Sequence, residues 1–248
     1  MRKIELMPVK KMPKINPGDN LSSEILLALD RQKIKLKKTD ILVVAHKIVS
    51  IAENRFVNLD NYKATHKAQR LSKKTGKSDK ICQLILDNST EILKISKGFV
   101  ISRNLLGIVS ANSGIDQSNI HEKNLALLLP KNPNRSAKNI SLEIAKKISV
   151  SIPIVISDSI GRPWRQGLTQ ISVGSYGILP IKRYRKDMYH KILKDTIVPI
   201  VDELASSAGL LMEKDAGIPV VLIRGYNYDS SRLNAGTLLR RKSDDVFR

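Results

Sequence analysis

Hydrophobic residues occur along this chain in short continuous runs that alternate with amphipathic stretches. The runs at 152–158 ("IPIVISD") and 218–224 ("IPVVLIR"), and the beginning of 40–53 ("DILVVA…"), are rich in Ile and Val and predict buried strands. A proline ends the shorter strand predicted within 3–9. The remaining extended segments predicted by the pattern are 98–102, 106–116 and 168–178.

Apolar residues at helical spacing separate these strands. The segment 20–32 begins with Asn20 and two serines nearby, a composition typical of a helix start, whereas Pro199 falls inside the last predicted helix. The predicted helices are 20–32, 64–74, 80–93, 136–148 and 195–212. Helices and strands therefore interleave irregularly, which favours a mixed α/β (α+β) fold over a regularly wound parallel sheet.

The 248 residues contain no internal repeat and no linker that divides them. This length suits one large domain or two intimately packed ones. We assign 1–225 to a single domain and the polar residues 226–248 to a loosely held tail of the same domain. No segment has the roughly 18 apolar residues of a membrane span, and the N-terminus lacks an apolar signal core, so we expect a cytoplasmic protein without membrane contact.

The charge balance is unusual, because 43 Lys and Arg residues against 23 Asp and Glu residues give a net charge of +20. Such a field attracts anions of any class, and a solvated coat of lysines explains it equally well. Aromatic residues make up only 4% of the chain, and no zinc-finger, helix-turn-helix or RNA-binding pattern is present. A basic nucleic-acid-binding protein is therefore the disfavoured alternative.

Two motif-like features carry no function. Residues 75–79 ("TGKSD") resemble the end of a phosphate-binding loop, but Leu71 stands where that motif needs glycine and a helix precedes it, so we expect an interhelical turn. Cys82, the only cysteine, lies in an apolar helical pattern and is expected to be a buried thiol.

Two aspartates follow predicted strands in similar surroundings. Asp116 comes after "GIVSANSGI", and Asp158 comes after "IPIVIS" and precedes Ser159. Carboxylates at strand ends can bind a hard cation such as Mg²⁺ and hold it against phosphate oxygens. A simple turn explains either aspartate alone, but the pair suggests one cation site.

Two arginines flank the only tryptophan shortly after the second aspartate. Arg162 and Arg165 bracket Trp164 in "SDSIGRPWRQG", and guanidinium groups suit phosphate or carboxylate recognition. The alternative is that Trp164 is a core or interface residue and that the arginines are its solvent-facing neighbours.

Taken together and in this order, several stretches resemble the coenzyme F420-0:L-glutamate ligase family, the gamma-glutamyl ligases. They are "NSGIDQSN", "LLLP", "SDSIGRPWRQG", "VDELASSAGLLMEKDAGIPVVLIRG" and "LLRRKSDDVFR". The resemblance covers essentially the whole chain. It implies the mixed α/β fold of that family and an intertwined homodimer.

The resemblance also implies a reaction. GTP, the co-substrate, would phosphorylate a carboxylate of coenzyme F420-0, and L-glutamate would displace the phosphate to form an amide. Further glutamates could be added through gamma linkages. The family needs Mg²⁺ or Mn²⁺, and a monovalent cation such as K⁺ often helps. A related ligase acting on a different carboxylate acceptor remains open, as do the preference for GTP over ATP and the number of glutamates added.

The resemblance assigns roles to individual residues. Asp116, Asp158, Ser159 and Met212 match metal-binding positions, the last through its backbone oxygen, and Arg162 and Arg165 are our candidates for holding a phosphate or carboxylate in catalysis. The matching nucleotide-binding positions are Met12, Pro13, Lys14, Ile15, His46, Lys47, Asn119, Leu210, Leu211, Met212, Glu213 and Lys214.

The sequence departs from the family pattern at three places. Ile51 stands where the family commonly has a nucleotide-contacting lysine, and Ser159 stands where threonine is frequent. The loop that includes Leu210–Lys214 is one residue shorter than usual. At Ile51, either Lys47 compensates from nearby or nucleotide affinity or choice differs, whereas the Ser159 hydroxyl can still approach a metal.

Overall fold

A five-stranded mixed sheet forms the centre of the computed structural model, which describes residues 3–118, 122 and 124–245. The strand order is β1-β12-β2-β8-β9, and only β2 and β8 run parallel. The bounds are β1 (Glu5–Pro8), β12 (Val220–Arg224), β2 (Ile41–Ala45), β8 (Ile154–Arg162) and β9 (Arg165–Tyr176). The mixed α/β fold predicted from the pattern is confirmed.

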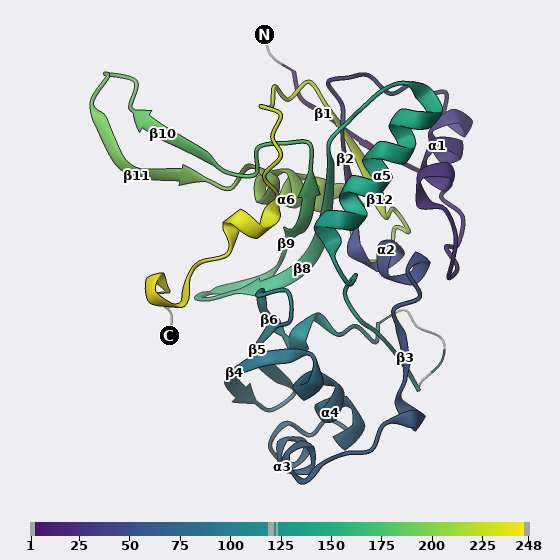
Figure 1. Ribbon diagram of the computed structural model, residues 1–248, viewed down its shortest axis with the longest axis vertical. Coiled ribbons are helices and arrows are strands. Elements are labelled where there is room, and N and C mark those ends of the chain that lie inside the picture. Colours follow the sequence, from purple (N-terminus) through teal and green to yellow (C-terminus); the bar gives the residue numbers. More distant parts are fainter. Residues whose placement is uncertain (1–2, 119–121, 123, 246–248) are drawn as a thin grey trace.

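Helices cover both faces of this sheet (Figure 1). Alternate residues of β2 supply the two cores, because successive side chains of a strand point to opposite faces: Leu42 joins the first core and Val43 the second. The helices of the first core are α1 (Leu21–Arg31), α2 (His46–Ala52) and α5 (Pro133–Ile148), and that of the second is α6 (Ile200–Met212).

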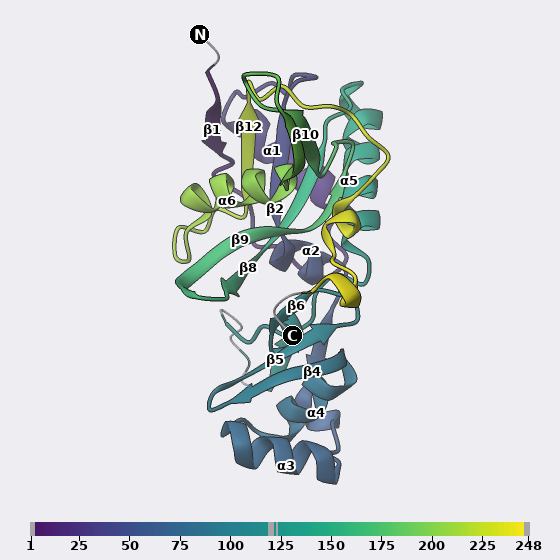
Figure 2. The same ribbon diagram turned by 90° about the vertical axis from the view of Figure 1, so that its left-hand side faces the viewer.

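A smaller lobe lies beyond the end of the central sheet (Figure 2). Its core gathers apolar residues of two helices and two small sheets around Leu84 and Ile85. The elements are β3 (Phe56–Asn58), α3 (His66–Thr75), α4 (Asp79–Asp87), β4 (Ser89–Ser96), β5 (Phe99–Asn104), β6 (Val109–Ala111) and β7 (Leu125–Leu127). The predicted turn between α3 and α4 is confirmed: Gly76 ends α3 with φ +74°, and the Ser78 side chain caps α4. Cys82 is buried, as expected.

Three predictions of local structure were wrong. The helix predicted over 80–93 ends at Asp87, and 89–96 is a strand because its β-branched residues pair with β5. Residues 195–198 belong to β11 (Ile192–Val198) instead of a helix, because Pro199 starts α6. The tail after 225 was expected to be loosely held, but its residues Tyr226, Tyr228 and Leu238 pack against the second core.

Two antiparallel ribbons extend away from the core. The β8–β9 hairpin continues past the sheet edge to a tip at Trp164, whose side chain is 89% exposed, so Trp164 is not a core residue. The ribbon of β10 (Lys182–Lys186) and β11 projects from the body (Figure 1). Within the described residues, no helix has the length and apolar character needed to cross a membrane.

Candidate functional site

The first part of the site lies where β2 passes into α2. β2 runs parallel to β8 with Ala45, its last residue, opposite Ser157, so the next residue of each chain segment, His46 and Asp158, can meet beyond the end of β2. His46 Nε2 lies 3.1 Å from Asp158 Oδ1, and both side chains are largely buried. The amide of Ser159 donates to the same oxygen at 2.6 Å. These two contacts fix the Asp158 carboxylate at the sheet edge.

Asp116 is held through its backbone and its side chain. Its backbone exchanges hydrogen bonds of 2.9 and 2.8 Å with Leu127. Lys47 Nζ lies 2.7 Å from Asp116 Oδ2, and Ser118 N donates to Oδ1 at 2.6 Å. Burial opposes ionisation of this carboxyl, but the hydrogen bonds from Lys47 and Ser118 outweigh it, so the pKa of Asp116 lies below its ordinary value. Asp116 is therefore a carboxylate at neutral pH.

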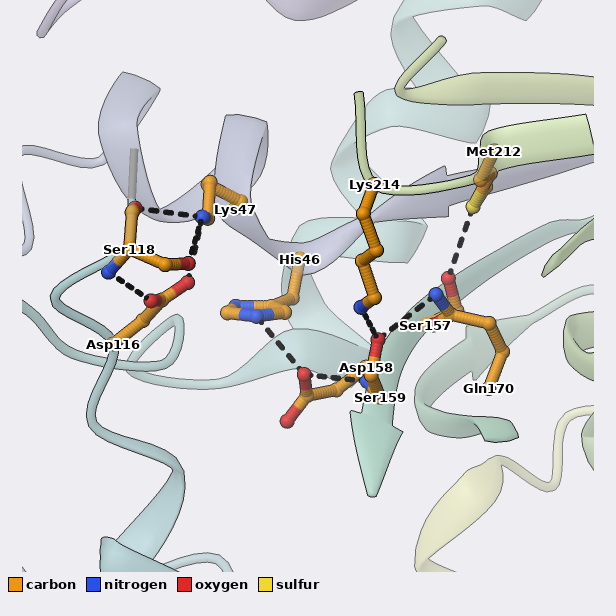
Figure 3. Close-up of polar contacts among 10 residues, drawn as sticks. All are labelled: His46, Lys47, Asp116, Ser118, Ser157, Asp158, Ser159, Gln170, Met212 and Lys214. Atoms are coloured by element: carbon orange, nitrogen blue, oxygen red, sulfur yellow. Dashed lines mark hydrogen bonds and ion pairs between the residues drawn. The ribbon is translucent and has the colours of Figure 1, made fainter. Parts of the chain in front are cut away.

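The two aspartates meet at the start of one helix. His46 and Lys47 are the first two residues of α2, and each contacts a different aspartate (Figure 3). Asp116 and Asp158 are 42 residues apart in the sequence, in the lobe and the central sheet respectively. The fold therefore brings the two predicted carboxylates to opposite sides of the same helix start.

The loop after α6 lies on a third side of the candidate site. Lys214 Nζ donates to Ser159 Oγ at 2.5 Å, and Gln170 Nε2 donates to the same hydroxyl at 3.0 Å (Figure 3). The Ser157 hydroxyl donates to the buried Met212 sulfur at 3.7 Å. The C-terminal loop is thus tied to the hairpin directly beside Asp158.

The predicted N-terminal segment Met12–Ile15 packs beside α2. Ile15 is buried in the first core, and Gly18 N donates to Ala52 O at 2.9 Å at the end of α2. Ile51 also packs against this core, so the side chain at the usual lysine position is used for apolar burial.

The other predicted nucleotide residues have mixed environments. Leu210 is exposed, Leu211 packs against the second core, and Glu213 ends α6 with φ +45°. Asn119 lies outside the described residues.

The structure does not bring Arg162 and Arg165 to the two carboxylates. Both lie exposed at the tip of the β8–β9 hairpin, where Arg162 donates to Gln166 O at 3.4 Å. Four residues separate Arg162 from Asp158, a span of about 13 Å along an extended strand. A role for these arginines at the same reaction centre therefore stays a prediction.

The donor atoms of the site fit a hard divalent cation. Asp116 and Asp158 offer carboxylate oxygens and Ser159 offers a hydroxyl, which are the ligand types that Mg²⁺ and Mn²⁺ accept. Among the described residues, no group of three or more His, Cys, Asp or Glu side chains is arranged to bind a metal. A cation here would need further oxygens from substrate or water, as is usual for Mg²⁺.

Sequence reasoning missed Gln170 and Ser118. Gln170 is the Cα partner of Ser159, so pairing the two predicted strands as a hairpin would have found it. Gly209 of α6 leaves room for the Gln170 side chain, because a Cβ at this position would lie 2.7 Å from Gln170 Cγ. Ser118 accepts from Lys47 through its backbone carbonyl, and no sequence signal marks such a contact.

Comparisons with known proteins show one consistent similarity. The model of the family described as F420-0:Gamma-glutamyl ligase matches residues 10–225. The "Coenzyme F420:L-glutamate ligase" of Methanocaldococcus jannaschii is 40% identical over 100% of this chain and 98% of its own length. Proteins of the same name from Methanothermobacter thermautotrophicus and Methanopyrus kandleri are 37% and 33% identical, each over 99% of this chain and over 99% and 97% of their own lengths.

Proposed function

Because the chain belongs to the F420-0:gamma-glutamyl ligase family, we propose that it joins L-glutamate to the carboxylate of coenzyme F420-0 and uses GTP to drive the reaction. Mg²⁺ or Mn²⁺ is the proposed divalent cofactor, and K⁺ the proposed monovalent activator. The observation that carries the proposal is the pairing of Asp158 with His46 and of Asp116 with Lys47 at one helix start.

The proposed chemistry proceeds through an acyl phosphate. The γ-phosphoryl group of GTP passes to a carboxylate oxygen of the acceptor, and GDP leaves. The amino nitrogen of L-glutamate, after losing a proton, attacks the acyl carbon; the amide forms and inorganic phosphate leaves. Phosphoryl transfer depends chiefly on positioning and on stabilising dispersed negative charge.

The residues of this site suit those two tasks. Asp116, Asp158 and Ser159 would hold the divalent cation, which supplies positive charge at the phosphate oxygens. Lys47 and Lys214 have ammonium groups next to these ligands and would contact the triphosphate. Segment Met12–Ile15 and the loop after α6 would bind the remainder of the nucleotide.

A mass-shift assay tests the proposed reaction. The purified protein is incubated with Mg²⁺, L-glutamate and F420-0, with GTP or ATP in parallel reactions. We expect the acceptor to gain the mass of one glutamyl residue in the GTP reaction, and nucleotide hydrolysis to match the amide formed. If F420-0 gains no mass, but another carboxylic acid does so under the same conditions, the alternative acceptor is correct.

We also propose that the protein is a homodimer formed through its projecting ribbons. An isolated two-stranded ribbon is marginally stable in water, yet β10–β11 exposes Met188 and Ile192, which are 82% and 81% accessible. Trp164 adds an exposed aromatic at the tip of the other ribbon. Large exposed apolar side chains of this kind mark protein contacts.

Light scattering by the purified protein measures its molar mass in solution and so tests the proposed dimer. We expect twice the mass of one chain for the wild type and the mass of a single chain for the double variant Met188→Asp, Ile192→Asp. Leu142→Asp, which places a charge at an exposed leucine of α5, is the control and should remain dimeric. A monomeric wild type would refute the ribbon-mediated dimer.

A further inference from the structure

A cavity of about 380 Å³ lies at the outer edge of the central sheet, where β9 has no strand beyond it among the described residues. Its walls come from several separate parts of the chain. They include the lobe segment 106–109, the start of α5 at 132–134, the β8–β9 hairpin, Asp202 of α6, and the tail at 235–240 and 245. The tail passes beside β9 on its way towards the lobe (Figures 1 and 2). The volume lies within the range of small-molecule sites.

The floor of this cavity shares a strand face with the candidate site. Ile171, which lines the cavity, is the Cα partner of Asp158 across the hairpin. Ile160, also in the lining, follows Asp158 by two residues on β8, and no register shift falls between them. Side chains of directly paired residues, and of residues two apart, point to the same face of a sheet. The floor therefore begins about 7 Å along the strand from the Asp158 carboxylate.

The lining combines an apolar surface with cations. Ile160, Ile171 and Val173 of the hairpin lie among the lining residues with Val109 of the lobe and Leu238 of the tail. Arg103, Lys131 and Arg240 also line the cavity, as does Asp245, whose Oδ2 lies 4.0 Å from Arg103 Nη2. Arg103 Nε is buried and has no hydrogen-bond partner within the described part of the chain. Such a lining suits a flat, partly apolar molecule that carries negative charge.

One carboxylate in the lining is incompletely satisfied. Asp202, in the first turn of α6, accepts a hydrogen bond from Ser172 N at 2.9 Å. Among the described residues, no salt bridge neutralises it. Burial raises the pKa of Asp202, and the hydrogen bond only partly offsets this effect. A partly buried carboxyl beside a cavity is a suitable partner for an N–H group of a bound ring.

We propose that this cavity binds the ring end of the acceptor, a planar heteroaromatic molecule with an anionic arm, and so directs the acceptor's carboxylate along the hairpin towards Asp158. The inference rests on the proposed function, in which the acceptor is F420-0. The apolar floor lies under the ring, Asp202 accepts from a ring N–H group, and the Arg103 guanidinium faces negative charge. The loop that includes Lys214 is tied to Ser159, the neighbour of Asp158, so the nucleotide contact proposed for Lys214 lies beside the end of the acceptor's path.

Equilibrium dialysis of the full chain against F420-0, without nucleotide, tests this site. Arg103→Gln removes a cation, and Val109→Trp fills the cavity. We expect each to weaken F420-0 binding by about tenfold or more, the size of a lost charge-assisted contact. Binding of a non-hydrolysable GTP analogue with Mg²⁺ should stay within about twofold of wild type. Arg70→Gln, at an exposed arginine of α3, is the matched control and should change neither affinity.

Asp202→Asn gives an independent test that does not depend on fold disruption. Asparagine keeps the acceptor oxygen for Ser172 N and removes the partly buried charge, so this variant should resist urea at least as well as wild type at neutral pH. The destabilising effect of the charge is fully present above the raised folded-state pKa, declines as pH falls through it, and is lost below the pKa of the unfolded chain. We expect weaker F420-0 binding in a protein of undiminished stability.

The outcomes separate this inference from the proposed function. If the wild type adds glutamate to F420-0 but the cavity variants bind F420-0 as tightly as wild type, the acceptor site lies elsewhere and only the inference fails. If the variants instead lose affinity for the GTP analogue alone, the cavity holds the nucleotide base and the inference is wrong. If the wild type neither binds nor extends F420-0, both fail.

Discussion

Asp158→Asn is expected to abolish glutamyl addition while leaving the protein folded. Asparagine has the shape of aspartate and keeps an oxygen to accept from His46 Nε2 and Ser159 N, so the local packing is preserved. It removes the negative charge that would attract a divalent cation. Loss of a group that stabilises developing charge typically costs about 10²–10³-fold in rate, and loss of a metal ligand should reach at least that range. The mass-shift assay measures the change.

The same substitution at the other carboxylate should have the same effect. Asp116→Asn also weakens the contact with Lys47 Nζ, so the amine is less well positioned beside the cation site. Thermal unfolding curves would show whether either variant is folded. Asp30→Asn, at an exposed aspartate of α1, serves as the control and should retain wild-type activity. Full activity in Asp116→Asn or Asp158→Asn would exclude that residue from the metal site.

A second measurement separates a metal role from a packing role. If the aspartates hold the cation, variants with residual activity should need more Mg²⁺ for half-maximal rate, and Mn²⁺ should partly rescue them. A variant that was merely misfolded would show the same Mg²⁺ dependence as wild type at a lower maximal rate.

Much of this site could be predicted because its carboxylates follow buried strands. Apolar runs in the sequence identify β2 and β8, and Asp158 became a candidate because it comes directly after the apolar run of β8; the parallel pairing that brings His46 beside it was not predicted. Asp116 was a weaker candidate, since the turn around it could have been no more than a turn. His46 and Lys47 came from family resemblance, because a histidine and a lysine after a strand are ordinary residues without it.

The parts that escaped prediction depend on register and on chain path. Gln170 reaches Ser159 only because the hairpin pairs these two residues, and register shifts lie on both sides of them. The helix predicted over 80–93 failed because Ile92 satisfies helical spacing but pairs with Ser102 in the sheet of the lobe. The cavity could not be foreseen at all, since one wall comes from a tail that the sequence pattern predicted to be loose.

The two carboxylates of the site belong to different parts of the fold. Asp158 is fixed to the central sheet and Asp116 to the lobe, and both are tied to α2 between them. Any displacement of the lobe would therefore change the distance between the two carboxylates. The packing of α5 against β9 matters for the cavity as well as for stability, because the first residues of α5 form part of the cavity wall.

Gly174→Ala is expected to destabilise the protein markedly, because this glycine lets β9 touch the start of α5. A Cβ at position 174 would lie 2.5 Å from the Pro133 carbonyl carbon and 2.7 Å from its oxygen. The backbone of Pro133 cannot easily yield: Asn132 caps the helix, and the Asn134 side chain accepts from Ser175 N at 2.9 Å. Overpacking of this kind costs about 1–3 kcal/mol, and sometimes more. Urea unfolding should show the loss as a lower midpoint, and F420-0 binding should weaken with it because the cavity wall moves.

Gly161→Ala on the paired strand is the matched control, since the nearest atom, Leu168 Cδ2, would lie 4.0 Å from the new Cβ. This control should be as stable as wild type, or slightly more stable, through the reduced entropy of its unfolded chain. Equal midpoints for Gly174→Ala and wild type would mean that α5 and β9 are not held in this close contact.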